Sequence, residues 1–228
     1  NSFVLNYLPG SIGESNFAHW KMTMMDENTK CQDVDNATVE LLEFKQLRIW
    51  LCWRYEKKNK NDRPTKVPYG ADGIGIGTTQ DYSRRWVSFE EASRAYEELG
   101  FDGVGFVIPK GFGGIDSDHR KEGDPINTDL VEHFQTYVEN SPSKTGRHWI
   151  FKCDTSYIPN QDGKLDSCYY CKNPKNDLEI YFGGLTNRFL TFTGDVVSDL
   201  PIVDCTKAAQ WFLDKYMLRP ALPDAPDM

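Results

Sequence analysis

Short apolar runs, rich in β-branched and aromatic residues and bounded by glycine, proline or polar residues, predict six strands. They fall at 48–54, 103–108, 113–118, 147–152, 178–182 and 188–193. Because only residues 109–112, which begin with a proline, separate the second run from the third, we expect these two strands to form a hairpin.

Apolar residues at helical spacing predict four helices, at 37–47, after Ser88, at 128–140 and at 206–218. The second begins with a capping box, Ser88 and Glu91, and ends at Gly100. The apolar faces of the last three are Phe89, Ala92, Ala95 or Tyr96, and Leu99; Leu130, Phe134 and Val138; and Ala208, Phe212 and Tyr216. Helices mixed with strands and hairpins predict an α+β domain built around a largely antiparallel sheet.

The chain has 228 residues, 39% of them hydrophobic, which suffices for one domain or for one domain with a small appendage. Residues 1–45 are polar and predict an N-terminal extension, followed by a folded domain at 46–218. Three prolines in 219–228 predict the start of a linker to a further C-terminal region.

The formal net charge of −8 does not by itself indicate nucleic-acid binding. Six basic residues nevertheless lie between Arg54 and Lys66, against Glu56 and Asp62, and form either a basic groove or a solvated loop. A membrane partner is not expected, because the chain has no apolar run of about 18 residues. The six cysteines show no regular framework and no secretion signal precedes them, so we expect reduced thiols and a cytoplasmic protein.

Asp116 and Asp118 carry the most informative chemistry. In a strand, residues i and i+2 project from the same face, so both carboxylates can reach one metal ion while Ser117 faces away. Oxygen ligands suit Mg²⁺ or Mn²⁺, two of which can hold the reacting groups of a phosphoryl transfer. Glu179 is the natural third carboxylate and Asp177 the reserve; alternatively, Asp-x-Asp merely ends a strand and caps a turn.

Two further segments suit a phosphate group. The turn that begins at Ser141 has small hydroxyl residues and Gly146, which let backbone amides approach an anion, and His148 follows on the next strand. Arg188 begins another strand and offers a guanidinium for bidentate phosphate binding. The alternatives are a core histidine at 148 and a surface ion pair at 188.

Taken together, these segments resemble the bifunctional DNA primase-polymerase domains of phages, plasmids and other mobile elements, in the archaeo-eukaryotic primase superfamily. The resemblance spans Trp50 to Gly194 and depends on the order and spacing of several motifs. They are Trp-Arg-Tyr-Glu56, Arg63-Pro-Thr-Lys-Val-Pro-Tyr69, Trp86-Val-Ser-Phe-Glu-Glu-Ala92, Phe101-Asp-Gly-Val-Gly-Phe-Val107, Gly114-Ile-Asp-Ser-Asp-His119, Ser141-Pro-Ser-x-Thr-Gly-x-His148, Glu179-Ile-Tyr181 and Arg188-Phe-x-Thr-x-Thr-Gly194.

The resemblance implies a palm like an RNA-recognition fold, backed by an N-terminal α/β module, with 46–218 as the catalytic domain. It implies that the metal carboxylates are Asp116, Asp118 and Glu179, and that His148 contacts the nucleotide phosphates. The other implied nucleotide contacts are Ser143, Arg188 and Lys66, together with Lys144, which stands where the family usually has a glycine.

The implied activity is template-directed nucleotidyl transfer in the replication of a mobile element. A 3′-hydroxyl would attack the α-phosphate of an NTP or dNTP on a single-stranded DNA template, with Mg²⁺ or Mn²⁺. A helicase domain is the C-terminal neighbour that the family suggests. Two alternatives are a non-catalytic module that binds DNA or nucleotides on the same scaffold, and a metal-dependent nuclease.

Cys153, Cys168 and Cys171 lie where some plasmid relatives carry a zinc stem. Cys168-x-x-Cys171 is one half of a zinc site and Cys153 is a third candidate ligand, but a structural site needs four. Free thiols or an incidental disulfide are therefore preferred to structural zinc.

Overall fold

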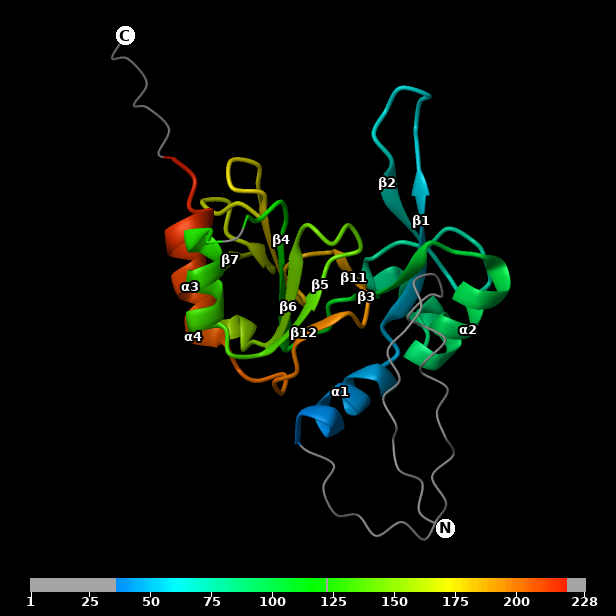
Figure 1. The fold of residues 1–228 in the computed structure, drawn as a ribbon, viewed down its shortest axis with the longest axis horizontal. Helices are drawn as coiled ribbons and strands as arrows, with labels where there is room; N and C mark the ends of the chain where they lie inside the picture. The colour runs from blue at the N-terminus through cyan, green and yellow to red at the C-terminus, as the bar shows by residue number, and fades with distance from the viewer. Residues whose placement is uncertain (1–35, 122, 221–228) are drawn as a thin grey trace, which may run out of the picture. The chain divides into compact units, whose positions relative to one another are not determined.

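The computed structural model describes residues 36–121 and 123–220 (Figure 1). Most of the predicted N-terminal extension, and residues 221–228 of the predicted linker, lie outside the described residues. The helices are α1 (Asn36–Gln46), α2 (Phe89–Leu99), α3 (Pro125–His133) and α4 (Thr206–Phe212), with 3-10 turns at Gln80–Arg85 and Thr155–Tyr157 and a π-helical turn at Leu213–Met217. The strands are β1 (Trp50–Glu56), β2 (Thr65–Tyr69), β3 (Gly103–Val107), β4 (Phe112–Ser117), β5 (Tyr137–Asn140), β6 (Arg147–Lys152), β7 (Asn160–Gln161), β8 (Lys164–Leu165), β9 (Lys172–Asn173), β10 (Leu178–Phe182), β11 (Phe189–Phe192) and β12 (Val196–Ser198).

The strands form two main sheets. One has four strands in the order β11-β3-β1-β2 and the other six in the order β12-β5-β6-β4-β10-β9; β7 and β8 form a separate pair. All neighbouring strands in them run antiparallel. This confirms the predicted α+β class with antiparallel pairing, although the strands divide between two sheets. Within the described part of the chain, no helix has the length and apolar character needed to cross a membrane.

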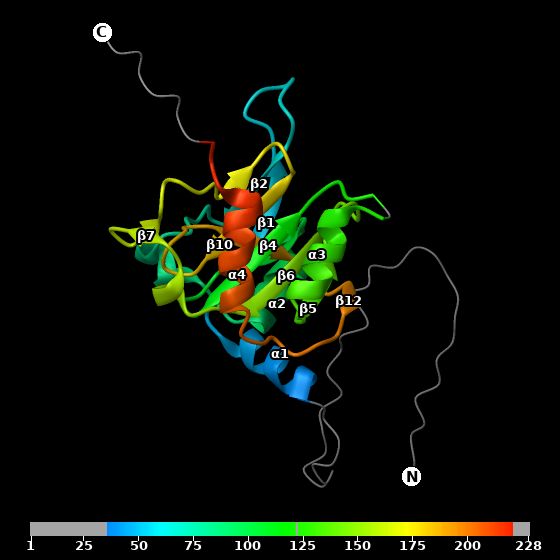
Figure 2. The ribbon, with the colours of Figure 1, turned by 90° about the vertical axis from the view of Figure 1, so that its left-hand side faces the viewer.

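Helices α3 and α4 cover one face of the six-stranded sheet (Figures 1 and 2). The strands contribute Ile115, Trp149 and Ile180 to this core and the helices contribute Leu130 and Phe212, all fully buried. Because side chains alternate along a strand, the residues between these apolar positions project from the opposite face. That opposite face carries the ionisable residues described below.

The four-stranded sheet is held by aromatic packing around Trp50 of β1. Its indole ring is fully buried and lies 4.8–5.7 Å, between ring centroids, from four phenylalanine rings. They are Phe44 of α1, Phe89 of α2, Phe106 of β3 and Phe192 of β11. Aromatic pairs of this kind each contribute about 0.5–1.5 kcal/mol beyond the burial of area, so β1 is firmly anchored at its N-terminal end.

Helix α2 has the termini that the sequence predicts. The Ser88 hydroxyl accepts from the Glu91 amide, and the Glu91 carboxylate accepts from the Ser88 amide at 2.8 Å. Gly100 ends the helix in the left-handed conformation, with φ 63°. Ala92 and Ala95 are buried as expected, whereas Leu99, in the last turn, is 44% exposed.

The predicted hairpin between residues 103–108 and 113–118 is wrong. Strand β3 pairs with β1 and β11, and β4 pairs with β6 and β10, so the two strands belong to different sheets. Both edges of β3 are already occupied, and the link through Pro109 carries the chain from one sheet to the other.

The helix predicted at 128–140 is also too long. Helix α3 ends at His133, and Tyr137–Asn140 form β5, which pairs with β6 and β12. Leu130, Phe134 and Val138 do share one core, as their spacing suggested, but Val138 reaches it from a strand. The sheet pairing of Tyr137 and Val138, an aromatic and a β-branched residue, outweighs the helical spacing.

The last helix buries a face different from the predicted one. Ala209, Phe212, Leu213 and Met217 are fully buried, whereas Ala208 and Tyr216 are only partly buried. The predicted stripe is therefore right only at Phe212. The π-helical turn at Leu213–Met217 shifts the register of the last residues, so Met217 is buried in place of Tyr216.

Candidate active site

A row of ionisable side chains crosses five strands of the six-stranded sheet. From β5 to β9, the residues directly opposite one another are Glu139, His148, Asp116, Glu179 and Lys172. Side chains at directly opposite positions of antiparallel strands have Cβ atoms about 4.5–5.5 Å apart. We call this set the polar row; it lies on the face of the sheet that faces away from α3 and α4.

Asp118 lies just beyond the end of β4. Its amide donates to the Asp177 carbonyl at 3.0 Å, and its own carbonyl accepts from Arg120 Nε at 2.9 Å. The turn before β6 packs closely here: a side chain at Gly146 would meet Asp118 Oδ1 at 2.5 Å and the Ser117 carbonyl oxygen at 2.7 Å. The position of Asp118 therefore depends on Arg120 and on the absence of a side chain at Gly146.

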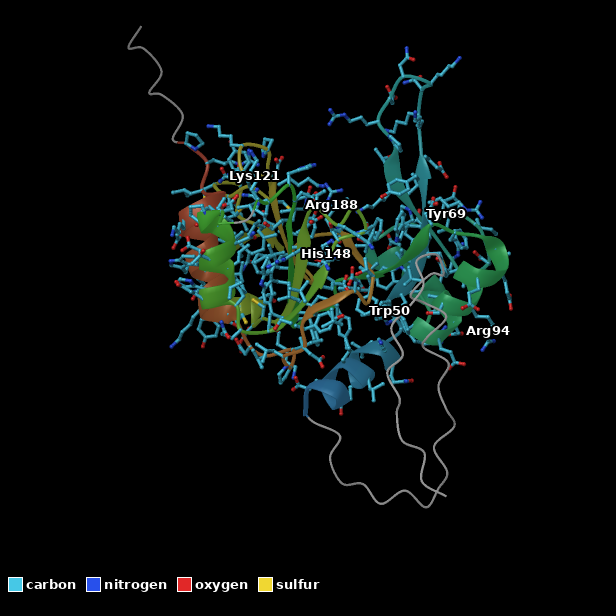
Figure 3. The ribbon with its side chains drawn as sticks, viewed as in Figure 1. Trp50, Tyr69, Arg94, Lys121, His148 and Arg188 are labelled. Atoms are coloured by element: carbon cyan, nitrogen blue, oxygen red, sulfur yellow. The ribbon has the colours of Figure 1, made fainter. Side chains whose placement is uncertain are left out.

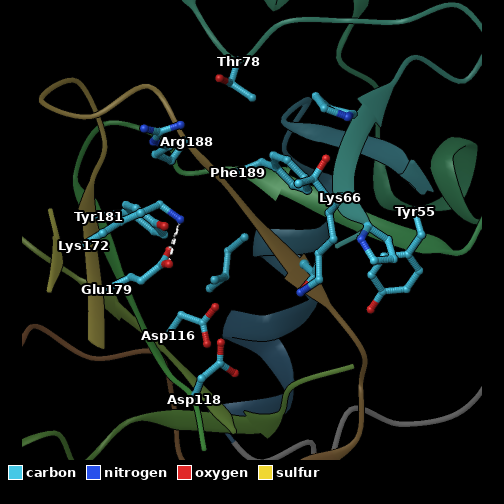
Figure 4. A pocket seen from close by; sticks show the side chains of 15 residues that line it. Tyr55, Lys66, Thr78, Asp116, Asp118, Lys172, Glu179, Tyr181, Arg188 and Phe189 are labelled. Carbon is cyan, nitrogen blue, oxygen red and sulfur yellow. Dashed lines mark hydrogen bonds and ion pairs between the residues drawn. The ribbon is translucent and has the colours of Figure 1, made fainter. Parts of the chain in front are cut away.

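A cavity of about 580 Å³ opens beside the polar row, and Figure 4 shows its lining. Asp116, Asp118 and Glu179 contribute carboxylates, while Lys66, Lys172 and Arg188 contribute cations. The remaining lining residues are Tyr55, Pro64, Thr65, Pro68, Thr78, Tyr181, Phe189, Leu190 and Thr191. The cavity therefore gathers three acids and three bases at the junction of the two sheets.

Burial has the largest effect on the pKa of two of the acids, Asp116 and Glu179. It raises the pKa of Asp116, against the opposing effect of His148. Burial also raises the pKa of Glu179, against its hydrogen bond and ion pair with Lys172. Asp116 Oδ1 is buried and has no hydrogen-bond partner among the described residues. A cation placed in the cavity would therefore relieve the cost of keeping both carboxylates ionised.

His148 lies on β6 of the six-stranded sheet (Figure 3) and is fully buried. It does not line the cavity. Its Nδ1 lies 3.1 Å from Glu139 Oε1, and its Nε2 lies 3.6 Å from Asp116 Oδ1. Burial lowers the pKa of His148, but Asp116 and Glu139 outweigh it, so the net effect is a raised pKa. The imidazole therefore bridges two carboxylates from behind the cavity.

Glu139 is held as firmly as His148. Its carboxylate is fully buried and accepts from the backbone amides of Thr193 and Gly194, each at 3.0 Å, and from the Tyr137 hydroxyl at 3.4 Å. Glu139 thus fixes the orientation of the imidazole, and the imidazole in turn backs Asp116. The motifs did not indicate Glu139, because it falls in the segment predicted to be helical.

The remaining predicted site residues divide into two groups. Arg188 and Lys66 line the cavity with Asp116, Asp118 and Glu179. Ser143 and Lys144 do not; Lys144 is exposed with φ 59°, and the Ser143 hydroxyl exchanges hydrogen bonds with Ser141 and Thr145.

Asp177, the reserve third carboxylate, precedes β10 with φ 47°. Its side chain is exposed and lies 3.6 Å from His119 Nδ1. Glu179 belongs to the polar row and lines the cavity, whereas Asp177 does neither. Of the two candidates, Glu179 is therefore the one that lies in the cavity with Asp116 and Asp118.

Lys172 was not indicated by any motif. It lies on the two-residue strand β9, and its ammonium lies 2.6 Å from Glu179 Oε2 and 2.7 Å from Oε1. Within 36–121 and 123–220, no three histidine, cysteine or acidic side chains are grouped closely enough to hold a metal ion. The Glu179 carboxylate is therefore neutralised by Lys172 in this structure.

The three cysteines considered as zinc ligands form no disulfide in the described part of the chain. Cys153 is buried, Cys168 is exposed, and the partly buried Cys171 donates to the Ile180 carbonyl. Burial raises the pKa of Cys153 and of Cys171 to about 11 each, which keeps both thiols protonated near neutral pH.

A comparison of the chain with protein-family models gives no match, and a comparison with curated protein sequences gives none either.

Proposed function

We propose that this protein is a template-directed nucleotidyltransferase of the DNA primase-polymerase type. One observation carries the proposal: three carboxylates, from β4, the residue after it and β10, face three cations within one cavity. Carboxylates suit divalent ions, and lysine and arginine suit the phosphates of a nucleotide. Polymerisation of nucleoside triphosphates needs both kinds of group side by side.

The donor atoms have the chemistry that suits a hard divalent cation, because Asp116, Asp118 and Glu179 offer only oxygen atoms and line one cavity. As the structure describes them, the three are not grouped closely enough to hold an ion, and Glu179 is paired with Lys172. These three residues would hold Mg²⁺ or Mn²⁺. When bound, such ions neutralise phosphate charge and help the attacking hydroxyl and the leaving pyrophosphate to react.

The cations would bind the triphosphate. Arg188, directly before β11, is exposed, lines the cavity and can form two parallel hydrogen bonds with phosphate oxygens. Lys66 reaches toward the acids from β2, and its positive charge favours the ionised form of Asp116 (Figure 4). Lys172 would be free to bind phosphate if the Glu179 side chain released it to bind a metal ion.

In the proposed reaction, the 3′-hydroxyl of a primer or first nucleotide attacks the α-phosphate of an incoming NTP or dNTP. The bond from the α-phosphorus to the oxygen bridging the α- and β-phosphates breaks, pyrophosphate leaves with the electron pair, and the hydroxyl proton is released to water. The chain contributes by holding both reactants in line, with Glu139 and His148 keeping Asp116 in place.

The proposed function also assigns a role to each of the two sheets. A six-stranded antiparallel sheet with two helices on one face and acids on the other is consistent with the palm that the resemblance implies. The four-stranded sheet, with α1 and α2, would then be the N-terminal α/β module.

The test is metal-dependent incorporation of labelled nucleotide on a primed single-stranded template. Asp116→Asn/Asp118→Asn should lower the initial rate by at least about a hundredfold, because metal-assisted phosphoryl transfer loses several kcal/mol of stabilisation. The matched control is Asp162→Asn/Asp199→Asn, which changes two exposed aspartates outside the cavity and should leave the rate unchanged. Undiminished incorporation by the first variant would overturn the proposal.

The Lys172–Glu179 ion pair favours one alternative, a non-catalytic module that binds DNA or nucleotides on the same scaffold. Such a module would bind a nucleoside triphosphate without incorporating it. Nucleotide binding by calorimetry, combined with no detectable incorporation with either metal ion, would establish that alternative instead.

A further inference from the structure

The connection between β1 and β2 concentrates positive charge that the rest of the structure leaves unpaired. Lys57, Lys58, Lys60 and Arg63 are exposed, and none forms an ion pair with another described residue. We call residues 54–66 the basic arm; its tip extends beyond the paired ends of β1 and β2 (Figure 1).

The two acids of the basic arm are engaged within the hairpin. Asp62 Oδ2 accepts from the backbone and side-chain amides of Asn59, at 3.0 and 2.8 Å. The Glu56 carboxylate accepts from the Tyr69 hydroxyl. The acids therefore shape the hairpin, and the four cations of the tip remain available to an external anion.

The basic arm is continuous with the cavity. Tyr55 and Lys66 lie directly opposite each other on β1 and β2, and both line the cavity. Tyr55 is an aromatic residue with 47% exposure, and its amide is fixed by a 2.6 Å hydrogen bond to Asp102 Oδ2. An exposed aromatic ring between the cavity and a row of cations is the arrangement that binds single-stranded nucleic acid, through base stacking and phosphate contacts.

The distribution of charge along the chain also supports the binding of a polyanion by the basic arm. The chain carries 34 acidic and 26 basic residues, yet four unpaired cations lie within seven consecutive positions, 57–63. A solvated loop on a chain of net charge −8 does not require such a cluster. Clustering one sign of charge near a cavity attracts an oppositely charged polymer and speeds its association.

We propose that the basic arm holds the phosphate backbone of single-stranded DNA, with one base stacked on Tyr55 at the mouth of the cavity. The choice of DNA rests on the proposed function, in which the cavity copies a DNA template. The binding surface itself rests on the charges and the exposed ring of the hairpin.

The test is fluorescence anisotropy of a labelled, mixed-sequence DNA single strand with the 228-residue chain, without nucleotide or metal, at several salt concentrations. Lys57→Gln/Lys58→Gln/Lys60→Gln should reduce the slope of log affinity against log salt by about 2, since each phosphate contact on a single strand contributes about 0.7. At about 0.1 M salt, the affinity should fall about ten- to a hundredfold.

The matched control changes three lysines outside the basic arm, Lys110→Gln/Lys164→Gln/Lys207→Gln. All three are exposed and form no ion pair with another described residue, so this variant has the same net charge as the first. Its slope should equal that of the unchanged protein. Tyr55→Ala should weaken binding about fivefold or more with the slope unchanged, because stacking releases no counterions.

An unchanged slope in the Lys57, Lys58 and Lys60 variant would overturn the proposed role of the basic arm. An equal reduction of the slope in the control variant would overturn it as well. The proposed function fails by a different result, incorporation that survives the loss of Asp116 and Asp118. The salt dependence of DNA binding therefore tests the basic arm, and nucleotide incorporation tests the proposed function. Either proposal can fail while the other holds.

Discussion

The six-stranded sheet and the four-stranded sheet contribute to the same cavity in different ways. The six-stranded sheet supplies the acids, and its side chains are fixed by neighbours on adjacent strands, as with Glu139, His148 and Asp116. The four-stranded sheet supplies Tyr55 and Lys66, from the base of an exposed hairpin. Arg188 comes directly before β11 of that sheet.

The contrast concerns how precisely each side chain is held. A buried carboxylate costs free energy unless it is paired, so the polar row is a set of mutually dependent groups. Exposed lysines cost little free energy of folding, and their side chains can adapt to a flexible polymer. We infer that the six-stranded sheet carries the chemistry, whereas the four-stranded sheet carries recognition of phosphates and template.

The largest expected effect tests whether Glu179 or Asp177 is the third carboxylate of the proposed metal site, beside Asp116 and Asp118. Glu179→Gln keeps the shape of the side chain and should lower nucleotide incorporation at least about a hundredfold, because a proposed metal ligand loses its charge. Asp177→Asn is the matched control, since Asp177 lies two residues away but outside the cavity. It should stay within about threefold of the unchanged protein, measured as the initial rate on a primed template. A larger loss in Asp177→Asn than in Glu179→Gln would reverse the assignment.

The second test concerns the buried end of the polar row. Glu139→Gln leaves His148 and two backbone amides facing an uncharged group, so the free energy of unfolding should fall by about 2–4 kcal/mol. Glu132→Gln, on the exposed side of α3, should change it by less than about 0.5 kcal/mol in the same urea titration.

Well below the unfolding temperature, Glu139→Gln should also lower kcat while leaving KM for the triphosphate unchanged. Glu139 acts through His148 on Asp116 and does not line the cavity. A raised KM with an unchanged kcat would show that Glu139 does not position Asp116.

The smallest expected effect concerns Lys172. Lys172→Met removes the cation that competes for Glu179, so the nucleotide-free protein should bind Mn²⁺ about two- to fivefold more tightly, in keeping with a half-exposed ion pair. Lys175→Met, which removes an exposed lysine without an ion pair to another described residue, should leave Mn²⁺ binding unchanged in the same calorimetric titration. Weaker Mn²⁺ binding in Lys172→Met would mean that Lys172 supports the metal site.

Local patterns in the sequence predict the parts of the site that depend on neighbouring residues. The short apolar runs at 147–152 and 178–182 give the bounds of β6 and β10 correctly, and the i, i+2 spacing places Asp116 and Asp118 together, with Ser117 buried behind them. The capping box and Gly100 likewise give the ends of α2.

What depends on strand pairing cannot be predicted in this way. Glu139 and Lys172 belong to the site only because β5 pairs with β6 and β9 pairs with β10. The spacing of Leu130, Phe134 and Val138 fits a helix equally well, and only the pairing of β5 decides against it. The path through Pro109 reads as a hairpin until the partners of β3 are known.

The order in which the chain visits the two sheets has a mechanical consequence. After β1, β2 and β3, the chain builds most of the six-stranded sheet, returns for β11 beside β3, and then adds β12 beside β5. Covalent links therefore join the sheets at three points, and β11 is fastened to both by its neighbours in the chain. Neither sheet can be excised as a self-sufficient fragment, and the walls of the cavity should unfold together as one cooperative unit.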